Sequence, residues 1–167
     1  MASGDTLATF FPADNEPPNS NPAALDVRNG VPVLDFDASS PDESAVFSGF
    51  MPRHYDGGGI TVTVGWAATS ATSGTISLDV SFMSISDDAD DLDSKSFAAA
   101  NNANPTAASA SGEVDYATVT FTDGADMDSI AAGEFFRMTV ARDADGTTST
   151  DNMTGDMELV FVEIKET

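Results

Sequence analysis

The sequence predicts an all-β protein: an antiparallel two-sheet sandwich, a jelly roll of about eight strands, preceded by an extended N-terminal arm. Two observations predict it. Short stretches alternate apolar and polar residues, and turns rich in glycine, proline or aspartate separate them. No stretch has the apolar spacing of a convincing helix. Another Greek-key sandwich is the alternative topology.

The clearest strand covers residues 60–66. Its apolar side chains share one face, with the period of two that is typical of a half-buried strand: Ile60, Val62, Val64 and Trp66. Trp66 is the only tryptophan, and we expect it to anchor the core. Residues 76–82 repeat the pattern, so we expect the two strands to pair as a long hairpin.

Further strands are predicted at 31–36, 45–51, 113–122, 134–142 and 157–165. In the stretch 113–122 the apolar positions change parity, which predicts a β-bulge near Thr118. The Ala- and Asn-rich segment 97–111 shows little pattern and is at most a weak strand. The last strand is apolar on both faces, which predicts a central strand covered on both sides. Its two rows are Met157, Leu159 and Phe161, and Val160, Val162 and Ile164.

Residues 1–30 are predicted to form the arm, and residues 31–167 the sandwich domain. Leu7, Phe10 and Phe11 make a short apolar patch in the arm. The proline-rich stretch 12–22 that follows cannot continue a helix or a central strand. The arm is therefore either an attachment element that lies across a neighbouring surface or a floppy terminus.

The charge of the chain limits its partners. Its 167 residues include 28 acidic and 6 basic ones, for a formal net charge of −22. Such a field repels phosphate backbones and anionic bilayers, so we expect no nucleic acid and no membrane as partner. The charge serves either solubility in salty water or docking onto a basic surface. Cysteine, a secretion signal and a transmembrane stretch are absent from the sequence, which predicts synthesis in a cytoplasm.

Catalytic motifs are not evident. His54 is the only histidine and is expected to be structural or exposed, since no nucleophile elbow accompanies it. In so acidic a chain, pairs of aspartates are uninformative about glycosidase chemistry. Calcium is the one plausible ligand, at Asp143–Asp151 or at the cluster Asp87–Asp93, although neither has the full calcium-loop spacing. We expect no catalytic residue and no cofactor, with solvated charge as the alternative to calcium.

Three motifs, in this order, resemble a group of small β-sandwich virion proteins of tailed phages that infect aquatic bacteria. They are DVRNGVPVLDFD (26–37), AVFSGFMP (45–52) and YDGGGITVTVGW (55–66), with FRMTVARD (136–143) and LVFVEI (159–164) completing the pattern. The resemblance implies a jelly-roll structural protein of the virion, made in the host cytoplasm. It further implies capsid cement or decoration, bound to the major capsid protein on the outer surface of the capsid. Leu7, Phe10 and Phe11 are then the expected capsid attachment residues.

A receptor- or carbohydrate-binding module of a tail or fibre is the competing function, because jelly rolls serve there too. It needs exposed aromatic side chains, and the chain has one tryptophan and two tyrosines. A hydrolase would rest only on unassignable aspartate pairs. We also expect a homo-oligomer, a trimer, because one apolar row of the last strand would be exposed beside Phe135. The predicted interface residues are Phe135, Val160, Val162 and Ile164; covering by 97–111 within the chain is the alternative.

Overall fold

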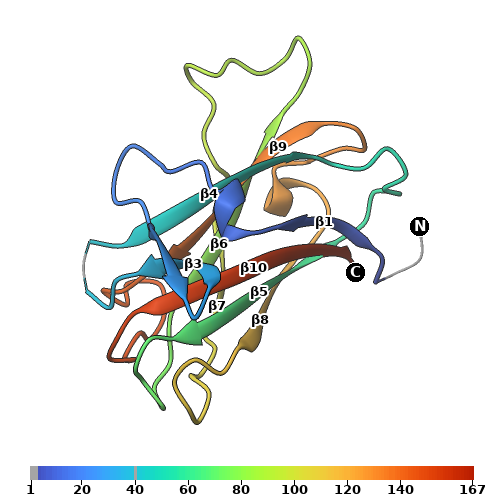
Figure 1. The fold of residues 1–167 in the computed structure, drawn as a ribbon. Coiled ribbons are helices and arrows are strands. Elements are labelled where there is room, and N and C mark those ends of the chain that lie inside the picture. Colours follow the sequence, from blue (N-terminus) through green and yellow to red (C-terminus); the bar gives the residue numbers. More distant parts are fainter. Residues whose placement is uncertain (1–3, 40) are drawn as a thin grey trace.

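The computed structural model describes residues 4–39 and 41–167 and confirms an all-β antiparallel sandwich (Figure 1). The described residues form ten strands and two short 3-10 helices, η1 (Pro12–Asp14) and η2 (Ala125–Met127). None of the described helices is long and apolar enough to cross a bilayer.

The strands of the described residues lie in two sheets. The six-stranded sheet has the order β2-β3-β10-β5-β8, with β1 beside β10: β1 (Thr6–Phe10), β2 (Ala24–Arg28), β3 (Val31–Phe36), β5 (Ile60–Ala68), β8 (Asp115–Phe121) and β10 (Met157–Glu166). The four-stranded sheet has the order β4-β9-β6-β7: β4 (Glu43–Phe50), β6 (Leu78–Ile85), β7 (Asn101–Ala103) and β9 (Phe135–Arg142). The segment 97–111 thus contributes the short strand β7.

The connections are those of a jelly roll, as predicted. From β3 to β10 each strand crosses to the other sheet, except that β7 follows β6 in the same sheet. The expected hairpin between residues 60–66 and 76–82 is wrong for this reason. β5 pairs with β10 and β8, whereas β6 pairs with β9 and β7. Both strands turn an apolar row toward the shared interior, so their similar patterns do not reveal which strands pair.

The core fills the space between the two sheets. Trp66 is 1% exposed, which confirms it as a core anchor. Phe82 of the four-stranded sheet meets Phe121 of the other sheet edge to face, with ring centroids 5.0 Å apart. Burying each such large side chain stabilises the fold by about 1.5–3 kcal/mol.

The prediction of an extended N-terminal arm is wrong. β1 pairs with β10, and β2 pairs with β3, so the described residues before Val31 are built into the six-stranded sheet. Leu7 and Phe10 are buried, and the Phe10 ring stacks on Phe47 at 5.5 Å. The reason lies in β10, since β3 pairs with only its first half and β1 supplies the partner for its second half. Residues 1–3 lie outside the described residues.

A β-bulge at Val160 overturns the predicted faces of the last strand. Leu159 pairs with Trp66 and Phe161 with Gly65, so Val160 is an extra residue on β10. The bulge reverses the side-chain parity of the strand. The side chains that point inward and are fully buried are therefore Met157, Leu159, Val162 and Ile164. Val160 and Phe161 face outward, and the predicted exposed row does not exist.

Strand β8 has no bulge, and the prediction of one near Thr118 is wrong. Its register with β5 runs without interruption from Asp115 to Phe121. Ala117, Val119 and Phe121 point into the core, whereas Val114 and Tyr116 lie on the outer face of the sheet, 48% and 65% exposed. The change in apolar parity thus marks two apolar faces on one regular strand.

Candidate binding face of the six-stranded sheet

Two aromatic rings stand on the outer face of the six-stranded sheet, one on the inner strand β10 and one on the edge strand β8. Tyr116 of β8 and Phe161 of β10 meet edge to face, with ring centroids 5.1 Å apart. Both residues pair with Gly65 of β5, which lies between them. A Cβ atom on Gly65 would overlap the Phe161 ring, so only glycine leaves the ring in this place. Tyr116 is 65% exposed and offers its ring to solvent.

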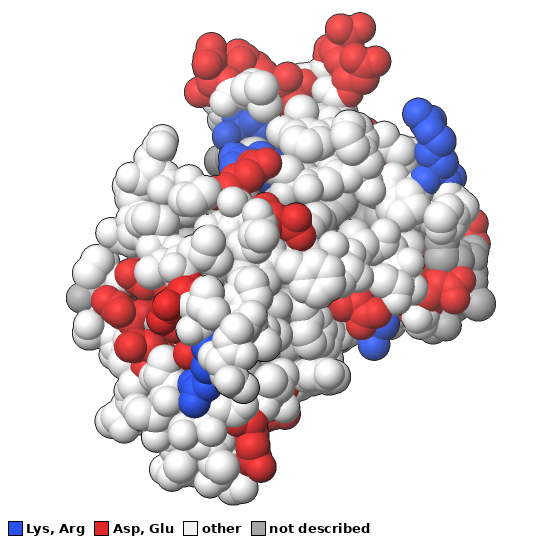
Figure 2. Space-filling model, in the orientation of Figure 1, with Lys and Arg blue, Asp and Glu red and all other residues white. Residues whose placement is uncertain are grey.

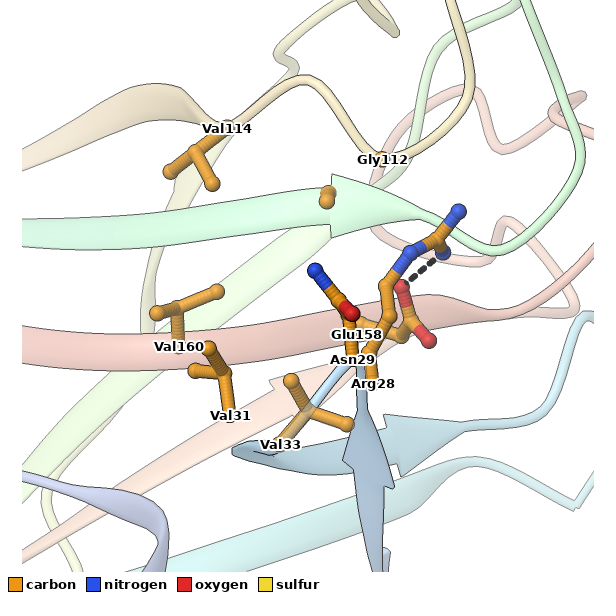
Figure 3. Close-up of a pocket in the computed structure, with 9 residues that line it drawn as sticks. Arg28, Asn29, Val31, Val33, Gly112, Val114, Glu158 and Val160 are labelled. Atoms are coloured by element: carbon orange, nitrogen blue, oxygen red, sulfur yellow. Dashed lines mark hydrogen bonds and ion pairs between the residues drawn. The ribbon is translucent and has the colours of Figure 1, made fainter.

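A concavity of about 230 Å³ lies beside the aromatic pair. Its lining residues are Arg28, Asn29, Val31, Val33, Ala67, Gly112, Val114, Glu158 and Val160. Figure 3 shows Val31, Val114 and Val160 toward one end and the polar side chains gathered at the other. The concavity therefore has apolar walls and a polar end, which is the composition of most small-ligand sites.

A tight turn between β2 and β3 positions the side chains at the polar end of the concavity. Asn29 and Gly30 connect β2 to β3 with φ of 49° and 82°, the two positive values of a type I′ hairpin turn. Arg28, just before the turn, forms an ion pair with Glu158 of β10 (Figure 3). Its Nη1 also donates to the carbonyl oxygen of Ala68 at 3.2 Å. The guanidinium is thus held at the rim of the concavity.

A second carboxyl group, Asp35, neighbours Glu158 across β3 and β10. Burial of Asp35, followed by repulsion from Glu158 and Asp26, raises its pKa from 3.8 to about 6. Its Oδ1 is buried and accepts no hydrogen bond from the described residues. A carboxyl group with a raised pKa is common at catalytic sites. Glu158, however, is engaged by Arg28, and Asp35 does not line the concavity.

Polar residues lie on the other side of the aromatic pair. Next to Gly65 along β5, the outward side chain is Thr63, which pairs with Thr118 and Glu163 in register. Thr63 is 5% exposed, and its hydroxyl group has no partner within the described part of the chain. This hydroxyl group is itself buried, so the polar groups that a ligand can reach on this side are those of the neighbouring strands, such as the exposed Thr118. The face is therefore aromatic in the middle and polar on both sides.

An apolar groove of about 290 Å³ adjoins the concavity and shares Val31 and Val160 with it. Phe11, 56% exposed, lines this groove together with Phe161. Of the three predicted attachment residues, only Phe11 is thus exposed, because Leu7 and Phe10 lie in the core.

The predicted interface residues are not brought together either. Val160 lies on the outer face of the six-stranded sheet, and Phe135 lies on that of the four-stranded sheet, packed on Phe50 at 5.3 Å. Val162 and Ile164 are fully buried in the core and unavailable for contact with another subunit. His54 is exposed in the turn after β4, as predicted.

One of the two predicted calcium sites brings carboxylates together. Oxygen atoms of Asp42, Asp143 and Asp145 lie within 4.8 Å of one another, whereas no such group within the described chain includes residues 87–93. Burial of Asp143 would raise its pKa, but hydrogen bonds from the backbone N–H groups of Thr148 and Thr147 lower it well below the ordinary value. These donors already occupy the carboxylate oxygens that a cation would need.

Comparison with known proteins shows the fold. No family model and no curated protein matches the chain. The CBM22-2 xylan-binding domain of Paenibacillus barcinonensis Xyn10C matches with TM-score 0.52 and 14% identity, over 92% of each chain. The K1 cleaved adhesin domain of Lys-gingipain from Porphyromonas gingivalis W83 matches with TM-score 0.51 and 15% identity, over 98% of this chain and 99% of that one. The chain shares their β-sandwich fold.

A third match is to part of a larger protein. The isomalto-dextranase of Arthrobacter globiformis T6, complexed with panose, matches with TM-score 0.51 and 17% identity over 80% of this chain. The present chain spans 18% of that enzyme. The two matches described above that cover both chains almost completely are a xylan-binding domain and an adhesin domain, and neither has a link to a phage particle.

Sequence reasoning missed the aromatic pair. Tyr116 breaks the apolar parity of its strand, a signal that fits an outward aromatic side chain as well as a bulge. Phe161 seemed to share a row with Met157 and Leu159, because the bulge at Val160 leaves no mark in the sequence.

Proposed function

We propose that the chain is a non-catalytic binding domain that holds a saccharide on the outer face of the six-stranded sheet. The observation that carries the proposal is the exposed Tyr116 ring, supported by Phe161 above the bare backbone of Gly65. An exposed aromatic ring with a polar tip packs against the C–H face of a sugar ring and hydrogen-bonds at its edge.

Polar groups on both sides of the ring supply partners for sugar hydroxyl groups. Arg28 and Glu158 offer a charged donor and a charged acceptor at the concavity. Thr118, which is exposed on β8, offers a hydroxyl group on the other side of the ring. The same arrangement is unsuited to hydrolysis, because Glu158 is neutralised by Arg28 and Asp35 lies outside the concavity.

The fold and the net charge of the chain indicate which class of saccharide it would bind. A xylan-binding domain with this fold matches nearly the full chain, which is a fold-level analogy. The net charge of −22 repels acidic polysaccharides such as alginate. The expected ligand is therefore a neutral glycan.

Native affinity electrophoresis tests the proposal, because the strong negative charge makes the protein migrate fast in gels without ligand. Gels containing xylan, β-glucan, dextran or alginate are compared. We expect at least one neutral polysaccharide to retard the chain and Tyr116→Ala to abolish the retardation. Leu25→Ala is the matched control, since Leu25 is 64% exposed on the edge strand β2. Equal retardation of all three proteins, or none in any gel, contradicts the proposal.

Capsid decoration is a second candidate, favoured by the apolar groove at Phe11. A protein surface fills such a groove better than a sugar does, and the expected partner is the major capsid protein. Deleting the N-terminal segment cannot test this, because β1 belongs to the sheet. Phe11→Ser should instead lower the copy number in purified particles, measured by mass spectrometry.

A homo-trimer is expected if the chain decorates a capsid. With Val162 and Ile164 in the core, an interface would be built on Val160 and the groove at Phe11. Sedimentation equilibrium at low and high salt measures it directly, and a monomer under both conditions contradicts the trimer.

A further inference from the structure

A groove of about 480 Å³ lies on the opposite side of the sandwich from the candidate saccharide face. Its floor is a row of three outward side chains from adjacent strands of the four-stranded sheet: Phe50, Phe135 and Ile85. One wall is the loop that follows β6 and projects from the sandwich at the top of Figure 1. Leu92 of this loop and Phe50 are 71% and 68% exposed, the two highest values among the large hydrophobic side chains of the described residues.

Carboxylates form the rim of the groove. Asp87, Asp88, Asp90 and Glu134 all line it. Figure 2 shows acidic side chains gathered on the projecting loop. Asp87 and Asp88 are exposed and have no ion-pair partner within residues 4–39 and 41–167. Asp87 and Asp88 therefore give the rim negative charge that no ion pair among the described residues compensates.

The cations near the groove leave most of this charge unbalanced. Lys95 is shared between Asp90 and Asp128, at 3.0 Å from each. Arg53 lies at Gly133, where an ideal Cβ atom would be 3.4 Å from its Nη1. Glu134 Oε2 accepts a hydrogen bond from the N–H group of Ala131 at 2.9 Å, which fixes its position.

We propose that this groove docks a basic segment of a protein partner that inserts an arginine side chain over Phe50. An aromatic floor under an acidic rim is complementary to a guanidinium group, which is planar, weakly hydrated and positively charged. Apolar stems of the partner's side chains would cover Phe135 and Leu92, while Asp87 and Asp88 receive its charged groups. The sequence offered two explanations of the negative charge, solubility and docking onto a basic surface. This groove is where we propose that the docking occurs.

Fluorescence anisotropy with labelled hexaarginine, hexalysine and hexaglutamate tests the proposal on the full chain. We expect hexaarginine to bind more tightly than hexalysine, and hexaglutamate not to bind. Phe50→Thr should weaken hexaarginine binding about two- to fivefold, the effect of one exposed cation–π contact. Phe50 is exposed, so threonine keeps the strand intact, and circular dichroism verifies the fold.

A charge-matched pair of variants separates docking from general attraction to an acidic protein. Asp87→Asn with Asp88→Asn removes two charges at the groove, and Asp115→Asn with Asp123→Asn removes two exposed charges elsewhere. Asp88 has φ of 55°, which asparagine adopts readily. The groove pair should lose several-fold more affinity than the control pair. Equal losses in the two pairs, equal affinity for hexalysine and hexaarginine, or no binding of hexaarginine at low salt overturns the proposal.

Discussion

A single buried arginine fastens the long polar loop after β9 to the end of the sandwich. Arg142 is fully buried, and its Nε and Nη2 each donate to a carboxylate oxygen of Asp151 at 2.8 Å. It also donates to the carbonyl oxygens of Gly155 and Met153 at 2.9 and 3.0 Å. The planar guanidinium satisfies several acceptors at once, which lysine cannot do.

Arg142→Lys should therefore destabilise the protein by about 3 kcal/mol, since it breaks a buried, bidentate ion pair. Urea unfolding followed by Trp66 fluorescence measures the loss. Arg137→Lys is the control, because Arg137 pairs with the exposed Glu16 at the surface. A loss below about 1 kcal/mol for Arg142→Lys, the level of a surface pair, would show that the loop is held by other contacts.

Asp35 makes stability depend on pH. Because its pKa is about 6 in the folded chain and 3.8 in the reference state, the folded chain binds the proton more tightly. The contribution of Asp35 to stability is therefore favourable at low pH and is lost as the pH rises through about 4 to 6. Asp35→Asn should raise the melting temperature at about pH 8 and leave it unchanged at about pH 4. The same change at both pH values contradicts the assigned pKa.

At the level of strands, the sequence predicts which segments are extended but not how they pair. Alternation at 60–66 and 76–82 correctly indicates two strands with inward apolar rows. Pairing depends on the long-range contacts between the sheets, and no local pattern encodes them. The bulge at Val160 could not be predicted for a related reason. Apolar residues occupy both alternating sets of positions in β10, so the sequence pattern is compatible with either register. The candidate site was missed because it depends on that register.

The effects of substitutions at Gly65 and Phe161 on stability should depend on each other. Gly65→Ala alone forces the Phe161 ring aside and should cost about 1–3 kcal/mol, as overpacking does. In a Phe161→Ala background the same change should cost nothing or stabilise, because alanine is stiffer than glycine in a strand. Chemical denaturation of the four proteins completes the cycle. Equal costs in both backgrounds would mean that the ring does not lie over the glycine.

For the whole molecule, we expect the charge of −22 to serve solvation and the acidic groove, and not a cation site. The carboxylates of Asp42, Asp143 and Asp145 already accept hydrogen bonds from backbone N–H groups of the loop after β9. We expect a chelator at constant ionic strength to leave the melting temperature unchanged, and added sodium chloride to raise it by screening self-repulsion. A chelator-induced fall that calcium reverses would establish a calcium site.

The two outer faces of the sandwich thus differ in chemistry. One is aromatic with polar flanks at Tyr116, and the other is an acidic groove over Phe50. We propose that the first is the binding face of the molecule.

Nuclear magnetic resonance titration of the labelled chain with xylohexaose, cellohexaose and isomaltohexaose tests whether this face binds saccharides. We expect at least one of them to shift amide signals concentrated at Gly65, Tyr116 and Phe161, with little change in the loop after β6. Shifts confined to the loops at the ends of the sandwich, or no shifts with any of the three, would contradict it.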